Sequence, residues 1–337
     1  MFNRKEAPPA EPAAAAVPHS FFSLTPERVL DAVERAGHRT TGMCYALNSL
    51  ENRVYEVELE DNTRIIVKFY RPGRWNKETI LDEHRLLSAL ETEEIAVAAP
   101  GKFPDGTTLQ INADGIFFAV FPRKGGRSPD ELSLDDHAEL GRLLARIHNI
   151  AASLHLTHRP VLTPQTYGRD CLKQILDHTQ ISSGLRERYV DAAERLIVIA
   201  EASYHDTATQ LIHADCHRGN LLRSPQGFLF LDFDDMAVAP PVQDLWLLLP
   251  SRPSDCPREL EAMLRGYETF RAFPHESLRL IEILRALRYI RYAGWIATRW
   301  TDPSFPRAFP YWGTDNYWQN QLSDLHEQLR VLEEGGP

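Results

Sequence analysis

Three residues that could handle phosphate chemistry lie close together in the stretch LIHADCHRGNLLRSPQGFLFLDFDD, which runs from 211 to 235. Asp215 and Asn220 are separated by four residues, and Asp232 directly follows the apolar run FLFL. An unpaired charge buried beside a strand costs several kcal/mol or more, so these acids need compensation. A divalent cation and its phosphate ligand would supply it.

The Asp-x-x-x-x-Asn spacing of Asp215 and Asn220 is the one that kinases use in their catalytic loop. Phosphoryl transfer needs a positioned hydroxyl, a proton acceptor, one or two magnesium ions and a cation on the phosphates. Asp215 is the candidate proton acceptor. Asn220 and Asp232 are candidate Mg²⁺ ligands, because Mg²⁺ takes hard oxygen donors and fills its remaining positions with phosphate oxygens. The pattern predicts catalytic roles for Asp215 and Asp232, with ATP as cosubstrate.

The cation that this chemistry requires is predicted at Lys68, within the apolar strand RIIVKFY. From the inner face of a strand, its ammonium group would reach the α and β phosphates of ATP. A carboxylate on the following helix would hold it. Glu83 is the favoured partner and Glu78 the second choice.

Each of these residues also has a purely structural interpretation. An aspartate before a turn often serves as a cap, and a strand lysine often reaches solvent along its aliphatic stem. His213 is expected to fix the loop through backbone hydrogen bonds, and His148 to be a satisfied core histidine. Cys216 is expected to be small and buried. The ordered conjunction of Lys68, a helix glutamate, Asp-x4-Asn and a strand aspartate favours phosphoryl transfer.

The composition of the 337-residue chain is that of a globular protein, with 43% hydrophobic and 25% charged residues. A formal charge of -10 argues against nucleic acid as a partner. No apolar run is long enough for a transmembrane helix, so we expect no membrane partner. Four cysteines without CxxC spacing indicate a reducing, cytoplasmic location. Residues 1–20, with four prolines, are predicted to be a disordered tail.

The pattern of elements changes along the chain and predicts an α+β protein with two lobes. Residues 21–125 form a β-rich N-lobe that contacts the nucleotide phosphates, and residues 126–337 form a helical C-lobe with the catalytic loop. Ligands favour the crevice between such lobes. The N-lobe is predicted to contain a helix at 24–37, a hairpin at 51–71, a helix at 77–91 and a strand at 115–122. The C-lobe is predicted to contain helices at 135–151, 185–202, 242–250, 257–271, 277–300 and 315–333.

The loop HADCHRGN, together with FLDFDD, resembles the aminoglycoside phosphotransferase and choline kinase superfamily, a branch of the protein-kinase-like fold. Members commonly show His-Gly-Asp-Leu-His-x-Gly-Asn, and here Ala214 and Cys216 replace the commoner Gly and Leu. A bacterial branch of serine/threonine protein kinases that act in stress responses is similar over most of the chain. The stretches that carry this resemblance are LNSLENRVYEV, VKFYRPGRW, DEHRLL, FFAVFP, GGR, PPVQDLWLLL and RWTDPSFPRAFP.

The resemblance implies an ATP- and Mg²⁺-dependent kinase that phosphorylates serine or threonine in proteins, including itself. By motif position it implies that Asp215 is the proton acceptor and that Asn220 and Asp232 are Mg²⁺ ligands. It also makes Ser49 a position that contacts ATP. His213 and His217 are implied as support for the loop. Asp244 would brace the loop. Alternatively, Asp244 is an acid near the N-terminus of a helix that interacts with the helix dipole.

Two departures leave other functions open. No G-x-G-x-x-G loop is present, so Ser49 and Asn52, or nearby backbone amides, would have to cradle the phosphates. Only eleven residues separate Asp232 from Asp244, too few for a long activation loop that docks a peptide. A kinase for an amino alcohol or related metabolite is therefore one alternative. A nucleotide-binding pseudokinase is another, but such a protein would not need a base at Asp215.

A stripe of basic and aromatic side chains late in the chain has two interpretations. Arg291, Trp295, Arg299 and Trp300 could line the acceptor site, but a packed helix with snorkelling arginines is favoured. A monomer is the default expectation.

Overall fold

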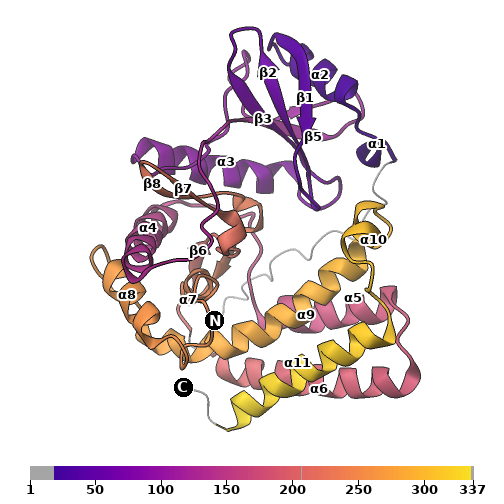
Figure 1. Cartoon of the computed structure of the whole chain (residues 1–337), viewed down its shortest axis with the longest axis vertical. Helices are drawn as coiled ribbons and strands as arrows, with labels where there is room; N and C mark the ends of the chain where they lie inside the picture. Colours follow the sequence, from indigo (N-terminus) through magenta and orange to yellow (C-terminus); the bar gives the residue numbers. More distant parts are fainter. Residues whose placement is uncertain (1–18, 206, 335–337) are drawn as a thin grey trace, which may run out of the picture. The chain divides into compact units, whose positions relative to one another are not determined.

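The computed structural model describes residues 19–205 and 207–334 (Figure 1). The predicted tail lies outside these residues, except for its last two positions, which begin helix α1 (His19–Phe22). The chain divides into two compact units. Unit 1 comprises Met1–Gly126 and Leu156–Pro160, and unit 2 comprises Arg127–His155 and Val161–Pro337. The second segment of unit 1 lies within the range that was predicted for the helical part.

Unit 1 is built on a five-stranded antiparallel sheet with the strand order β1-β2-β3-β5-β4. Lys68 pairs with Val54 on one side and Ala119 on the other, so it lies on the central strand. The hairpin turn contains Asn62 with a positive φ of 64°, a conformation that asparagine tolerates better than most residues. The strands are β1 (Thr40–Ala46), β2 (Arg53–Leu59), β3 (Arg64–Phe69), β4 (Gln110–Ile111) and β5 (Phe117–Pro122).

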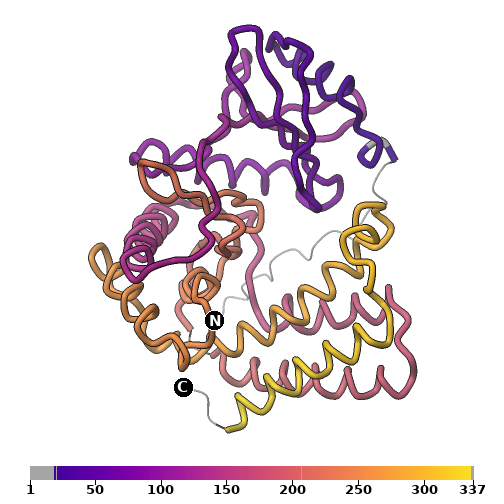
Figure 2. The backbone as a smooth tube through the Cα atoms, viewed as in Figure 1, coloured from indigo at the N-terminus to yellow at the C-terminus, as the bar shows by residue number. Residues whose placement is uncertain are grey.

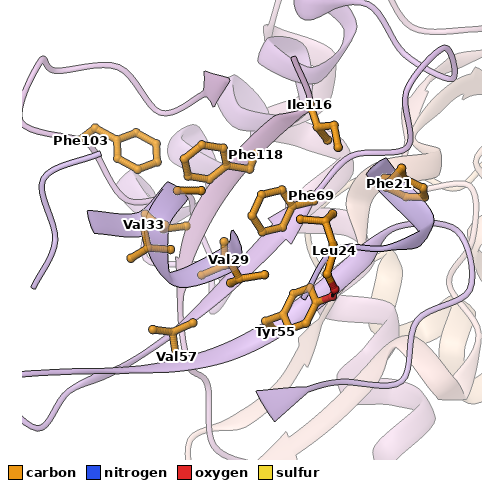
Figure 3. Close-up of a cluster of buried hydrophobic side chains, with 13 residues drawn as sticks. Phe21, Leu24, Val29, Val33, Tyr55, Val57, Phe69, Phe103, Ile116 and Phe118 are labelled. Atoms are coloured by element: carbon orange, nitrogen blue, oxygen red, sulfur yellow. Dashed lines mark hydrogen bonds between the residues drawn. The ribbon is translucent and has the colours of Figure 1, made fainter. Parts of the chain in front are cut away.

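One face of this sheet packs against helix α2 (Pro26–Arg35), whose Val29 and Val33 are fully buried (Figure 3). Strand β3 contributes Val67 and Phe69 to this core. Because side chains alternate along a strand, Lys68 must point to the opposite face. Helix α3 (Lys77–Thr92) supplies the partner for Lys68 there, as described below.

Unit 2 is mainly helical. Its helices are α4 (Leu134–Ser153), α5 (Asp170–His178), α6 (Ser183–Ser203), α7 (Val242–Trp246), α8 (Pro257–Tyr267), α9 (Ile281–Arg299), α10 (Ser304–Ala308) and α11 (Asp315–Glu333). Helix α4 packs on α8, α5 on α9 and α6 on α11, as the backbone trace shows (Figure 2). Glycines permit the first of these contacts, since a Cβ at Gly141 would lie 2.0 Å from the Met263 carbonyl oxygen.

Two small antiparallel strand pairs lie among these helices. Strand β6 (Gln210–Ile212) pairs with β9 (Ala237–Ala239), and β7 (Leu221–Ser224) pairs with β8 (Gly227–Phe230). The chain leaves β6, forms the loop that contains Asp215, and enters β7 directly after Asn220. It leaves β8 two residues before Asp232. The strands therefore fix both ends of the predicted catalytic loop.

The predicted fold class is confirmed: a sheet-containing N-terminal part is followed by a largely helical part. The helix predicted at 315–333 has these bounds in the structure. Other boundaries differ, because α7 ends at Trp246 and the first turns of the predicted 277–300 helix are a 3-10 helix (His275–Leu280). Strand β1 and helix α5 were not predicted. Among the described residues, no helix combines the length and hydropathy needed to cross a membrane.

Candidate active site

In unit 1 the predicted ion pair involves Lys68 and Glu83, whose Nζ and Oε1 atoms lie 3.2 Å apart. The side chains are only 9% and 2% exposed. Glu78 lies exposed in the first turn of α3. The difference follows from the helix period, which turns Glu83 toward the sheet and Glu78 toward solvent.

Tyr70 holds the second oxygen of Glu83 and was missed by the sequence analysis. Its hydroxyl group lies 3.3 Å from Glu83 Oε2 and 3.0 Å from His84 Nε2, and His84 Nδ1 lies 2.8 Å from the Thr108 hydroxyl. Burial, with a smaller contribution from the Lys68 charge, lowers the pKa of His84 to about 3, so this imidazole is neutral. Tyr70 lies two residues after Lys68, so the period of a strand could have indicated it.

The loop before β2 contains Ser49 and Asn52, which were predicted to cradle phosphate. Asn52 is 3% exposed, and its Oδ1 accepts a hydrogen bond from the Arg71 backbone N–H at 3.1 Å. Arg71 also donates to the carbonyl oxygens of Glu51 and Leu50. These bonds fix Asn52 within the loop, and its contact with phosphate stays a prediction. Ser49 is half-buried.

In unit 2 the carboxylate of Asp215 is held by three side chains. Arg288 donates to its Oδ1 at 2.9 Å, while His217 Nε2 and Asn220 Nδ2 each lie 3.4 Å from its Oδ2. Asn220 Nδ2 also donates to the Asp215 carbonyl oxygen at 3.1 Å. The Asp215 side chain is 25% exposed, so solvent or a ligand can still reach it.

Opposing influences act on the pKa of Asp215. Burial is the largest and would raise this pKa, but the hydrogen bond from His217 and the charge of Arg288 outweigh it. The pKa of Asp215 therefore lies well below its usual range. The carboxylate is ionised at neutral pH and can accept a hydrogen bond from a hydroxyl group.

Replacing Arg288 with glutamine should lower the free energy of unfolding at pH 7 by about 1 kcal/mol or less, because the pair is partly exposed. A depressed carboxyl pKa stabilises the fold above the unfolded-state value near 3.9, and this stabilisation is lost as the pH falls through the folded-state value. Urea unfolding of both proteins should therefore show a difference that shrinks as the pH falls through the folded-state pKa values of Asp215 in the two proteins, since the unfolded-state value is common to both. A difference that grows as the pH falls below 4 would contradict the assigned ion pair.

Asn220 and Asp232 are brought to the same end of the β7–β8 pair. Leu221 pairs with Phe230, and the Leu231 N–H donates to the Asn220 carbonyl oxygen at 2.8 Å. Asp232 comes next, is exposed, and has a left-handed backbone with φ of 59°. This turn carries it out of the line of the strand. The two oxygen donors fit Mg²⁺, which usually takes only one or two protein ligands together with phosphate oxygens.

No group of three or more His, Cys, Asp or Glu side chains among the described residues is arranged to hold a metal ion. Mg²⁺ at Asn220 and Asp232 would take its remaining ligands from phosphate oxygens and water.

His213 and Asp244 hold the catalytic loop through hydrogen bonds to its backbone. Asp244, fully buried, accepts hydrogen bonds from the backbone N–H groups of His213 and Ala214 at 2.9 and 2.6 Å. The imidazole of His213 lies between the Asp215 N–H and the Leu231 carbonyl oxygen. His213 therefore ties the loop to the strand end that precedes Asp232. These are the contacts that a loop-supporting residue would make, and the support roles of both residues stay predictions.

Further buried residues complete this support. His148 on α4 is fully buried and lies 3.0 Å from Asp244 Oδ2 and 2.9 Å from the Tyr267 hydroxyl group. It is the satisfied core histidine that was expected, and it orients the bracing carboxylate. Gln243 donates to the Ala214 carbonyl oxygen at 3.0 Å. Together these groups hold Ala214 at a φ of 69°, a conformation that favours the glycine found more commonly at this position.

Helix α9 brings a second arginine to the acidic stretch. Arg291 donates to Asp235 Oδ1 at 3.0 Å and lies over the Tyr167 ring at 4.1 Å. Trp295 packs against Phe305, with ring centroids 4.9 Å apart. The basic and aromatic stripe is therefore partly a packed helix, as favoured, and partly a set of ion pairs. Arg288 was missed because it is 73 residues from Asp215, and no local pattern links the two.

This fold and constellation define a phosphotransferase. The sequence profile of the phosphotransferase enzyme family matches residues 46–281, and the chain belongs to that family. The chain is 39% identical over 316 residues to "Stress response kinase A" of Escherichia coli K12, covering 94% of this chain and 95% of that one. It is 37% identical, with the same coverage, to "Serine/threonine protein kinase RdoA" of Salmonella typhimurium LT2. The predicted resemblance is confirmed.

Solved structures show the same fold at low sequence identity. An amicoumacin kinase, solved in complex with AMP-PNP, Ca²⁺ and Ami, has a TM-score of 0.70 at 19% identity, covering 88% of this chain and 93% of that one. A microcompartment-associated aminopropanol kinase has a TM-score of 0.67 at 22% identity, covering 91% and 98%.

Proposed function

We propose that this protein is a serine/threonine protein kinase that transfers the γ-phosphoryl group of ATP to protein hydroxyls, including its own, in a stress response. The ion-paired Asp215, in contact with Asn220, carries the proposal for the chemistry, together with Asp232 at the same end of the β7–β8 pair as Asn220. For the acceptor, support comes from the relative named as a serine/threonine protein kinase, which matches over 94% of the chain.

Each group has a separate task in the proposed reaction. Asp215 accepts a hydrogen bond from the acceptor hydroxyl and takes its proton as the phosphoryl group transfers. Asn220 and Asp232 would hold Mg²⁺, which neutralises charge on the phosphate oxygens when bound. In unit 1, Lys68, held by Glu83, would bind phosphate oxygens. Ser49 and the backbone amides near it would contribute further donors.

Replacing Asp232 with asparagine should raise the Mg²⁺ concentration needed for half-maximal phosphoryl transfer by about tenfold or more, because a charged ligand becomes neutral. A magnesium titration of the initial rate at saturating ATP measures this. Asp114→Asn, on a loop of unit 1, is the control and should leave the titration unchanged. Identical magnesium curves for Asp232→Asn and the parent protein would remove Asp232 from the metal site.

Replacing Lys68 with methionine should raise the KM for ATP and lower kcat/KM by about 10²-fold, since a buried charge-assisted contact to phosphate is lost. Initial rates across an ATP series measure both constants. Lys102→Met, an exposed lysine of unit 1, is the matched control. An unchanged KM and kcat would show that Lys68 has only a structural role.

A small-molecule kinase is the second candidate function. The short segment between Asp232 and Asp244 favours it, because it leaves little chain to build a peptide-docking surface. A pseudokinase is disfavoured, since a binding module has no need of an ionised aspartate at position 215.

Incubation with Mg²⁺ and γ-labelled ATP separates these functions. The reactions contain no acceptor, a generic acceptor protein, or a panel of amino alcohols. We expect label on the protein itself and on serine or threonine of the acceptor protein. Label found only on a metabolite would overturn the proposed acceptor in favour of the second candidate. Nucleotide binding without any transfer would overturn the enzymatic function.

A further inference from the structure

The side of the catalytic loop that faces helix α9 carries a cation next to the proposed base. Arg288 lies on α9 and binds Asp215 Oδ1 through NH1 at 2.9 Å. Its guanidinium group has five N–H donors in a planar fork. Among the described residues, Asp215 is its hydrogen-bond and ion-pair partner, and the Arg288 side chain is 35% exposed. The fork therefore retains donors that a ligand at Asp215 can reach.

Among the residues that the structure describes, Arg288 makes no ion pair with a second acid. Asp235, the next acid of the stretch, is engaged by Arg291 at 3.0 Å. His217 lies on the opposite oxygen of Asp215, with its Nε2 atom 3.4 Å from Oδ2. Tyr292, one turn along α9, is 45% exposed. The surface beside the base is thus a guanidinium group bordered by an exposed aromatic ring.

This arrangement disfavours a cationic acceptor. The negative charge of Asp215 is already engaged by Arg288, so a protonated amine that approaches from the Arg288 side meets the guanidinium group, and like charges lower affinity. A carboxylate or phosphate group beside the reacting hydroxyl would instead complete the coordination of Arg288, because guanidinium binds such groups with two parallel hydrogen bonds. The chain as a whole has a net charge of -10, so long-range attraction does not account for an acidic partner. An acidic acceptor would be selected by the local contact with Arg288.

We infer that Arg288 selects acceptors in which the phosphorylated serine or threonine is flanked by acidic residues. The inference rests on the proposed function and specifies its substrate class. Arg288 acts as a specificity-determining residue that also positions Asp215 through its ion pair.

Three synthetic peptides of equal length test this, each with one central serine flanked by glutamates, glutamines or lysines. The readout is the ratio of kcat/KM for the glutamate peptide to kcat/KM for the lysine peptide, measured for each enzyme variant. Loss of the cation also leaves the Asp215 carboxylate uncompensated, which by itself would disfavour the glutamate peptide. Arg288→Lys separates the two effects, because it keeps a charge beside Asp215 but loses the planar fork. If Arg288 acted only by neutralising Asp215, Arg288→Lys would keep the parent ratio, whereas loss of a bidentate contact to the acidic flank lowers it.

For the parent protein we expect a ratio of about ten or more, as a partly exposed charged contact allows. Arg288→Gln should bring the ratio to about one, and Arg288→Glu should bring it below one. Arg265→Gln, an exposed arginine of α8 that pairs with Glu261, should keep the parent ratio.

A parent ratio of one or less, or a ratio unchanged in Arg288→Gln, would overturn the inference while leaving the kinase function standing. Failure of the proposed function would look different, because none of the three peptides and no residue of the protein itself would become labelled.

Discussion

Replacing Asp215 with asparagine should lower kcat for phosphoryl transfer by about 10²–10⁴-fold, the usual effect of removing a positioned general base. The amide is nearly isosteric, so it can keep its contact with Asn220, but it accepts a proton poorly and loses the ion pair with Arg288. ATP affinity should change by no more than a few fold, because Asp215 is assigned to the acceptor hydroxyl. Initial rates give kcat, and titration calorimetry gives the affinity.

Asp191→Asn is the matched control, since this aspartate of α6 has a 70% exposed side chain. It should keep the parent rate. Asp215→Asn with the rate of the parent protein would exclude Asp215 as the proton acceptor. A large loss of ATP affinity would instead place Asp215 in nucleotide binding.

Replacing Asp244 with alanine should destabilise the protein by about 3–5 kcal/mol, as removal of one partner from a buried polar network does. Two backbone N–H groups, of His213 and Ala214, would lose their acceptor, and His148 would lose its partner. Because Ala214 needs these bonds to keep its positive φ, the loop should also lose its conformation. Urea unfolding measures the destabilisation, and the transfer rate should fall with it.

The matched control for this change is Asp191→Ala, which should stay within about 0.5 kcal/mol of the parent protein. Asp244→Asn tests the charge at constant shape. Its amide presents one acceptor oxygen in place of two, so we expect a loss between those of alanine and the parent. If Asp244→Ala unfolded at the same urea concentration as Asp191→Ala, the bracing role would be wrong.

Local sequence patterns predicted much of this molecule. The Asp215 to Asn220 spacing, the apolar run before Asp232 and the amphipathic helix at 315–333 are all set by neighbours in the chain. The pair of Lys68 with Glu83 was also accessible, because strand alternation and helix period together orient both side chains.

Contacts between distant parts of the chain could not be predicted in this way. Arg288 reaches Asp215 from a helix that folds against the loop only in three dimensions. Strand β1 was missed because its side chains are mostly exposed and give no apolar alternation. Asn52 was predicted to bind phosphate because it lies in the stretch LNSLENRVYEV, which takes the place of a glycine-rich loop. Its burial and its bond to Arg71 are consequences of tertiary packing.

The proposed function depends most directly on a magnesium–nucleotide complex held by Asn220 and Asp232. Titration calorimetry of the folded, full-length protein with a non-hydrolysable ATP analogue tests this, once at millimolar Mg²⁺ and once with a chelator. The predicted result is saturable binding with one nucleotide per chain at millimolar Mg²⁺, weakened about tenfold or more by the chelator. Absence of heat at millimolar Mg²⁺, or equal affinity in both conditions, would contradict it.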